Sequence, residues 1–147
     1  MALSQGKARI FAGNGKRMRI PGTNAVTFYA GSIVRVDRAT GLVVKPGATA
    51  TYVGCGVCER QVTADAAAGR NEVEVVFGDG TLEIDQIEVT GLNNQNDVGD
   101  PVWASDDDTL TLTDDGVSKP IGVVTRYYGS GTKGRVLLFP FYMEQGL

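Results

Sequence analysis

The chain has 147 residues, with 14 lysines and arginines, 17 aspartates and glutamates, and no histidine. Its formal net charge of −3 excludes a strong overall field toward nucleic acid or a membrane surface. Its length predicts one domain, and the lack of histidine, the commonest general base, argues against an enzyme.

Hydropathy predicts no membrane partner. No apolar stretch approaches the ~18 residues that cross a bilayer, and no signal peptide is expected from the polar first residues. We therefore expect the chain to be made in the cytoplasm and to stay soluble until it joins a larger assembly.

The charges are distributed unevenly along the chain. No acidic residue precedes Asp37, whereas no lysine or arginine lies between Arg70 and Lys119. Five basic residues fall within the first twenty positions, namely Lys7, Arg9, Lys16, Arg17 and Arg19. This asymmetry is typical of a basic interaction segment ahead of an acidic body.

The first 21 residues are polar, basic and rich in glycine, with one apolar pair, Ile10 and Phe11. This pattern predicts an extended N-terminal arm over residues 1–21, ahead of a single β domain over residues 22–147. An ordinary first strand is an equally compatible interpretation of the same residues.

Short apolar runs between turn residues predict strands over residues 26–29, 33–37, 42–45 and 52–58. Gly41 can adopt the positive φ that the turn of the first hairpin requires. The alanine-rich residues 61–70 are too short for a stable helix, so we expect a loop.

The next segment predicts a hairpin. Alternating apolar residues at 73, 75 and 77 lead into Gly78-Asp79-Gly80, and residues 81–84 return with the same alternation. Residues 86–90 are expected to continue this sheet. A further strand is predicted over 109–113, and a last hairpin joins 121–128 to 135–139.

One pattern occurs twice without a gap. Residues 31–60 and 99–128 each contain a strand, a turn, a second strand, a loop and a third strand, 68 positions apart. Such periodicity indicates a duplicated supersecondary unit. The sequence therefore predicts an all-β fold, a small barrel or sandwich, and pairs Arg35 with Trp103 at an outward position.

Two motifs resemble functional sites. Gly129-x-Gly131-x-x-Gly134 matches a dinucleotide fingerprint in letters, but a strand follows it where a helix is required, so it predicts a hairpin turn. Cys55 and Cys58 lie three apart on a predicted strand and point to opposite faces, which argues against a shared metal. We expect one of these thiols to be buried and the other to lie at the surface.

The acidic clusters at residues 106–108 and 114–115 lack the spacing of a calcium-binding loop. They bracket the strand predicted at 109–113 and are more typical of polar hairpin ends. The sequence therefore predicts no catalytic residue, no bound metal and no cofactor.

Three stretches of the second repeat resemble the head-decoration, or capsid cement, proteins of tailed bacteriophages. They are residues 99–105 (Gly-Asp-Pro-Val-Trp-Ala-Ser), the alternating strand 109–113 and residues 121–126 (Ile-Gly-Val-Val-Thr-Arg). The weaker first copy adds to the resemblance, which covers residues 30–139 and leaves the arm unmatched. It implies a β-barrel protein, often a homotrimer, that clamps major capsid subunits on the outside of the mature virion head.

This resemblance suggests where the chain makes contact. Its arm would meet acidic patches of the major capsid protein through the basic residues and anchor through two apolar ones, together Lys7, Arg9, Ile10, Phe11, Lys16, Arg17 and Arg19. The apolar C-terminal end is expected to pack on the body, the capsid or another copy through Phe139, Phe141, Tyr142 and Met143. Direct nucleic-acid binding is not expected, because the arm lacks interleaved aromatic residues.

Two other classes remain open. One is a different phage structural subunit, of the tail tube or the head–tail connector. The other is a carbohydrate-binding β domain, for which Trp103, Tyr127 and Tyr128 are the candidate residues.

Overall fold

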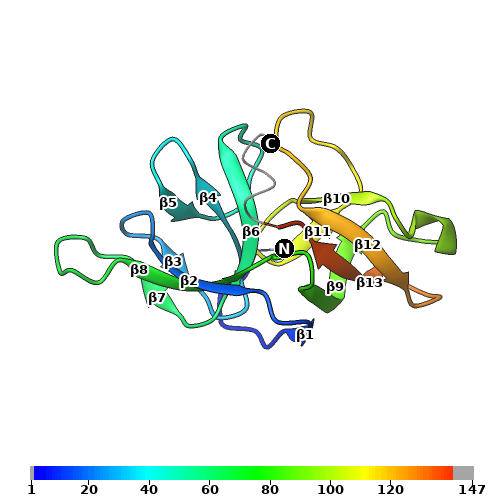
Figure 1. Cartoon of the computed structure of the whole chain (residues 1–147), viewed down its shortest axis with the longest axis horizontal. Coiled ribbons are helices and arrows are strands. Elements are labelled where there is room, and N and C mark those ends of the chain that lie inside the picture. The colour runs from blue at the N-terminus through cyan, green and yellow to red at the C-terminus, as the bar shows by residue number, and fades with distance from the viewer. Residues whose placement is uncertain (1, 141–147) are drawn as a thin grey trace.

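The computed structural model describes residues 2–140 and shows an all-β molecule with two lobes (Figure 1). The lobes lie side by side, with β6 between them in the view of Figure 1. The strands are β1 (Ile10–Ala12), β2 (Lys16–Pro21), β3 (Thr27–Phe28), β4 (Ile33–Asp37), β5 (Leu42–Val44), β6 (Tyr52–Cys58), β7 (Val62–Thr63), β8 (Glu72–Phe77), β9 (Glu83–Thr90), β10 (Pro101–Ala104), β11 (Thr109–Thr111), β12 (Gly122–Tyr127) and β13 (Lys133–Leu138). A single 3-10 turn, η1, covers Gln95–Asp97.

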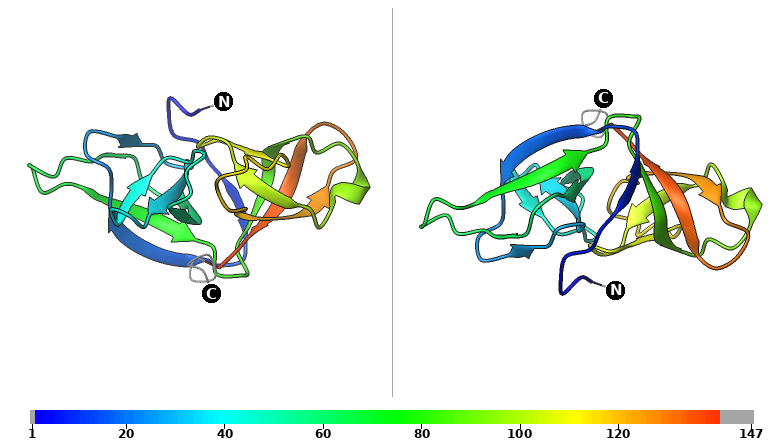
Figure 2. Two further views of the ribbon diagram at one scale, coloured as in Figure 1. Left: turned by 90° about the horizontal axis from the view of Figure 1, so that it is seen from above. Right: turned by 90° about the horizontal axis from the view of Figure 1, so that it is seen from below.

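Each lobe is a small barrel. The C-terminal barrel is a closed ring of β9, β13, β12, β10 and β11, because β9 pairs with both β11 and β13. The N-terminal barrel runs β2, β8, β6, β4 and β5, and one parallel bridge from Gly22 to Val43 joins its ends. The two lobes are seen end-on from above and below in Figure 2.

The predicted duplication is confirmed in three dimensions. β2, β8, β6, β4 and β5 have the same order as β9, β13, β12, β10 and β11. The bridge from Gly22 to Val43 is parallel, and so is the pair of Thr90 with Thr111, each residue 68 positions further on. The repeated unit is therefore larger than the two predicted 30-residue segments and includes a first strand and a last strand.

The hairpin predicted between residues 73–77 and 81–84 is wrong. β8 pairs with β2 and β6, whereas β9 pairs with β1, β11 and β13. Gly78 donates to the carbonyl of Cys55, and the Asp79 carboxylate accepts from the Thr81 amide at 2.8 Å. Residues 78–80 thus connect one barrel to the other instead of turning a hairpin. β8 makes six register pairs with β2, and this ladder replaces the expected pairing of β8 with β9.

The two apolar runs after this crossover form one strand, β9. Gln86 has a φ of +52°, in the left-handed region, and lies where the register with β13 shifts. Such a bulge changes the phase of the alternation by one residue. Ile84 and Ile87, three apart, are for this reason both fully buried in the same core.

The expected N-terminal arm is not confirmed. β2 pairs along its whole length with β8, and Met18 and Ile20 pack against the core of the N-terminal barrel. Arg17 and Arg19 alternate with them on the exposed side. The alternative interpretation, an ordinary strand, is correct for residues 16–21. These residues form a wall of the N-terminal barrel, so deleting them would open it.

β6 is buried on both of its faces. Cys55 and Val57 belong to an apolar cluster that continues through the C-terminal barrel, whereas Val53 and Cys58 belong to the core of the N-terminal barrel. The expectation that the two cysteines point to opposite faces is confirmed. The expectation that one lies at the surface is wrong, because the second barrel covers the outer face of the strand.

The outward position expected for Arg35 and Trp103 is also wrong. Arg35 is 1 % exposed and donates through Nε to the carbonyl of Gly54 at 2.8 Å. Trp103 is 8 % exposed, and its indole nitrogen donates to the carbonyl of Ser118 at 3.2 Å. The loop between β11 and β12 covers both side chains, and Arg35 also reaches the carbonyl of Lys119.

The loop expected over residues 61–70 is present apart from the two-residue strand β7, which pairs with β3. The hairpins β4–β5 and β12–β13 are confirmed. Gly129 and Gly131 have positive φ in the β12–β13 turn, as a hairpin interpretation of that glycine motif requires.

Among the glycines of residues 2–140, Gly31 has the closest backbone neighbour. It has a φ of +83°, and a Cβ there would lie 1.8 Å from the carbonyl oxygen of Lys7. Gly41 has a similar φ of +74° with nothing within 4 Å. The two glycines therefore separate the cost of the backbone conformation from the cost of the close approach.

We expect Gly31→Ala to destabilise the chain more than Gly41→Ala. Both substitutions should lower the free energy of unfolding by about 1–2 kcal/mol, because they place a side chain on a residue in the left-handed region. Gly31→Ala should lose a further ~1 kcal/mol or more, because the Lys7 carbonyl must move. Equal losses in urea unfolding would show that residues 6–9 do not press on Gly31.

Candidate interaction surface

Residues 2–9 cross the junction between the two barrels. The amide of Lys7 donates to the carbonyl of Ala30 in the N-terminal barrel at 2.7 Å. The amide of Leu3 donates to the carboxylate of Asp107 in the C-terminal barrel at 2.8 Å. The segment is thus attached to both lobes through its backbone amides, one of which donates to a carbonyl and the other to a side-chain carboxylate.

Asp108 fixes the basic side chains of this segment. Its Oδ1 lies 2.9 Å from Lys7 Nζ and 2.8 Å from Arg9 Nη2. The Arg9 side chain is only 4 % exposed, and its Nε donates to the carbonyl of Gly31 at 2.7 Å. Arg9 is therefore a structural cation, whereas Lys7, 44 % exposed, remains at the surface.

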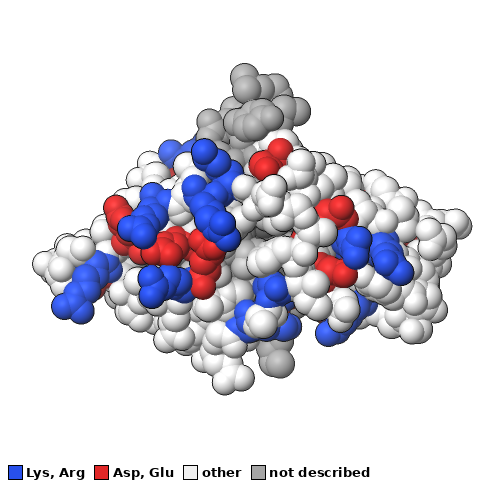
Figure 3. Space-filling view, turned by 60° about the horizontal axis from the view of Figure 1, so that its bottom comes forward, with Lys and Arg blue, Asp and Glu red and all other residues white. Residues whose placement is uncertain are grey.

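The basic residues of β2 also face acidic residues of the same chain. Arg17 lies 2.9 Å from Glu59, and Arg19 lies 3.1 Å from Glu74. Their side chains remain 75 % and 67 % exposed, so each pair contributes only about 0–1 kcal/mol. Figure 3 shows blue and red side chains interleaved over the left part of this face.

Ile10 and Phe11 stay exposed in β1. They are 52 % and 42 % exposed, and Val117 is the only other large apolar residue within residues 2–140 that is so exposed. Neighbours on a strand point to opposite faces, so β1 is uncovered on both sides. The predicted apolar anchor is thus available, although on a short strand and not on a free arm.

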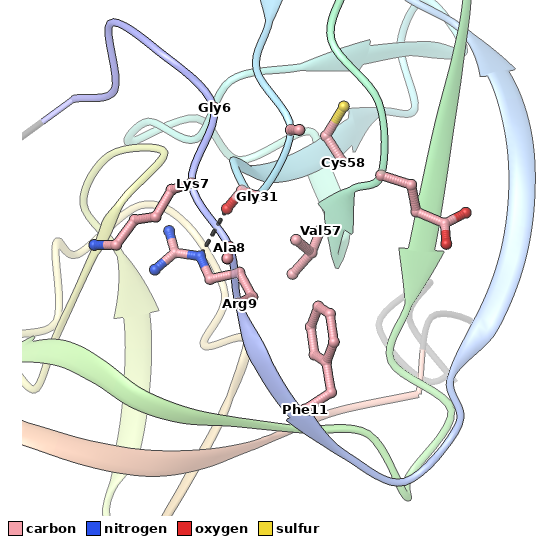
Figure 4. A pocket seen from close by; sticks show the side chains of 10 residues that line it. Gly6, Lys7, Ala8, Arg9, Phe11, Gly31, Val57 and Cys58 are labelled. Atoms are coloured by element: carbon pink, nitrogen blue, oxygen red, sulfur yellow. Dashed lines mark hydrogen bonds between the residues drawn. The ribbon is translucent and has the colours of Figure 1, made fainter.

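A groove lies between β1 and the end of β6. It has a volume of about 480 Å³ and is lined by Gly6, Lys7, Ala8, Arg9, Phe11, Ala30, Gly31, Val57, Cys58 and Glu59. In Figure 4 the side chain of Phe11 points toward Val57 across this groove. The groove brings together three of the predicted contact residues, Lys7, Arg9 and Phe11, and its wall after β6 includes Glu59, the partner of Arg17.

Cys58 in the wall of the groove is not a reactive thiol. Burial raises its pKa to about 11, although it donates to the carbonyl of Arg60 at 3.0 Å. The nucleophile at a cysteine is the thiolate, which this environment disfavours near neutral pH. The groove therefore offers shape and polarity and no activated sulfur.

The predicted C-terminal contact is described only in part. Phe139 is half-buried, and its amide donates to the carbonyl of Ile121 at 2.9 Å. Phe141, Tyr142 and Met143 lie outside the described residues. Phe139 thus directly follows β13, which pairs with Ile84 of β9, as β1 does through Phe11.

The acidic residues before β11 have structural partners. Asp106 accepts from the amides of Asp108 and Thr109 at 2.8 Å each, as expected for a polar hairpin end. Asp107 is 1 % exposed, which differs from the solvated position expected for it. Lys45 Nζ lies 3.9 Å from its Oδ2. Over residues 2–140, no three side chains of His, Cys, Asp or Glu gather as metal ligands would.

The three aromatic residues considered for sugar binding do not form an open platform. Trp103 is buried under the loop between β11 and β12, and Tyr127 packs on the apolar core. Tyr128 donates to the Asp85 carboxylate, whose pKa a hydrogen bond from Arg135 at 3.0 Å lowers. The Arg126 guanidinium covers the Tyr128 ring at 4.7 Å from its centroid.

Sequence reasoning found the basic residues and the apolar pair but missed the residues that receive them. Asp108 and Gly31 come from distant segments, and the wall residues Val57 and Glu59 come from β6. One signal was available, because the acidic excess between Arg70 and Lys119 is opposite in sign to the basic excess of the first twenty residues. It indicates an internal attraction as readily as an external one.

In the part of the chain that the structure describes, no helix has the length and apolarity to cross a membrane. Comparisons with family models, with curated proteins and with solved structures found no match for this chain.

The unequal burial of the ion pairs predicts unequal effects on stability. Asp108→Asn should lower the free energy of unfolding by about 2–4 kcal/mol, because the buried Arg9 loses its counter-charge. Glu59→Gln, which removes the partner of the exposed Arg17, should cost less than about 1 kcal/mol. Urea unfolding measures both, and similar losses would contradict a structural role for the Asp108 cluster.

Proposed function

We propose that the chain is a decoration protein of a tailed-bacteriophage head, which binds the outer capsid surface and stabilises contacts between major capsid subunits. The observation that carries the proposal is the position of the three resembling stretches. Residues 99–105 and 109–113 include β10 and β11, and residues 121–126 include all but the last residue of β12; the three are neighbouring strands of the closed barrel. The resemblance thus follows one continuous structural unit.

The distribution of surface properties supports a binding role. The exposed apolar pair of β1 and the exposed cations of β2 lie within residues 10–19, and the groove adjoins Phe11 of β1. Contacts of moderate strength suffice for such a role, because self-association, as a homotrimer in this proposal, multiplies them through effective concentration. The proposal includes no catalytic step and no cofactor.

Co-sedimentation with phage heads tests the proposal. The purified full-length chain should bind expanded empty heads saturably and bind unexpanded heads much less, because a decoration protein recognises the mature lattice. Light scattering of the free chain should give the mass of three copies. Absence of binding to expanded heads would overturn the proposal, and stacked rings or tubes in electron micrographs would favour a tail-tube or connector subunit.

A further inference from the structure

β1 is an edge strand of the larger sheet. It stands at the end of the sheet order and makes three register pairs with β9, at Ile10, Phe11 and Ala12. Within residues 2–140 no strand pairs with its other edge. A strand edge with free N–H and C=O groups is a template for a further strand, and proteins usually cover or charge such edges.

The groove beside β1 has the size and lining to receive side chains. Its volume of about 480 Å³ lies within the ~300–1,000 Å³ of ordinary ligand sites. Ala8, Ala30 and Val57 give it an apolar lining, with Phe11 at its edge (Figure 4). An extended segment placed along β1 would therefore bury apolar side chains as it completes the sheet.

The charges around β1 select the chemistry of the occupant. Lys16, Arg17 and Arg19 follow β1 directly, and all three are exposed. Glu59 and Glu74 are the carboxylates paired with the two arginines, so one positive charge remains in excess. Lys7 at the groove is also 44 % exposed. A segment with acidic side chains beside its apolar ones complements this surface.

A second copy of the chain fits this surface less well. Pairing β1 with β1 about a twofold axis would bring the same basic segments together, and like charges in contact disfavour association. A nucleic acid is also a poorer fit. Arg17 and Arg19 already pair with carboxylates, and the apolar side chains of Phe11 and Val57 offer no hydrogen bond to a phosphate. An acidic and apolar protein segment remains the best match.

We propose that an extended segment of the major capsid protein, with apolar and acidic residues, pairs with the free edge of β1 and places an apolar side chain in the groove. This inference rests on the proposed function and identifies its contact site. Main-chain hydrogen bonds would supply affinity, and the groove would select the side chain.

Matched substitutions test the site on expanded empty heads. Phe11→Ser removes the apolar contact, and Ala8→Trp fills the groove. Each should weaken binding about tenfold or more. Val117→Ser and Ala67→Trp make the same changes at exposed positions elsewhere and should alter binding less than about twofold. Thermal unfolding of all four variants verifies that they fold. If Phe11→Ser does not fold, the comparison of Ala8→Trp with Ala67→Trp still tests the site.

Hydrogen exchange on the bound chain distinguishes strand pairing from side-chain contact alone. Those amides of residues 8–12 that do not already donate to β9 should exchange at least about tenfold more slowly on heads than in free solution, because a pairing strand accepts their hydrogen bonds. Raising the salt concentration should weaken binding, since acidic side chains meet exposed cations.

The outcomes separate this inference from the proposed function. If the unmodified chain binds heads and Phe11→Ser and Ala8→Trp bind equally well, the contact site is wrong while the function stands. If the amides of residues 8–12 that do not donate to β9 keep their exchange rates, strand pairing is wrong. If the unmodified chain does not bind heads, both the function and the site are overturned.

Discussion

The burial of β6 on both faces is the constraint on which the rest of the structure depends. Side chains from one face fill the N-terminal barrel, and Cys55 and Val57 on the other join the core of its neighbour. Each buried valine contributes about 1.5–3 kcal/mol, so separating the barrels would expose apolar surface at considerable cost. We therefore expect the two repeats to unfold as one unit and not as two linked domains.

This shared core determines what remains for the surface. Once the barrels are joined, the crossing segment 2–9 can reach Ala30 on one side and Asp107 on the other. Its buried cation, Arg9, is used internally, and Gly31 has no side chain because the segment passes directly over it. The apolar pair of β1 is left outside this closure, which is why binding is assigned to it.

The sequence predicted the strands better than their partners. Strands 33–37 and 52–58 were predicted within their observed bounds, because alternation and turn residues are local signals. The crossover at Gly78–Gly80 has the same local composition as a hairpin, and only the competing ladder with β2 decides between them. The burial of Cys55, Arg35 and Trp103 was not predictable from alternation. It depends on the second barrel, which covers the outer face of β6, and on the loop between β11 and β12, which covers the other two side chains. In the candidate site, Ile10 and Phe11 were predictable as an apolar pair in a polar segment, whereas the groove beside them required the position of β6.

Native-state hydrogen exchange measures most directly whether the two barrels are one unit. The most protected amides of β6 and β8 and those of β12 and β13 should exchange through the same global opening, with equal free energies and equal dependence on denaturant. A lower opening free energy for β12 and β13, with β6 and β8 still protected, would show that the C-terminal barrel unfolds alone and would contradict the shared core.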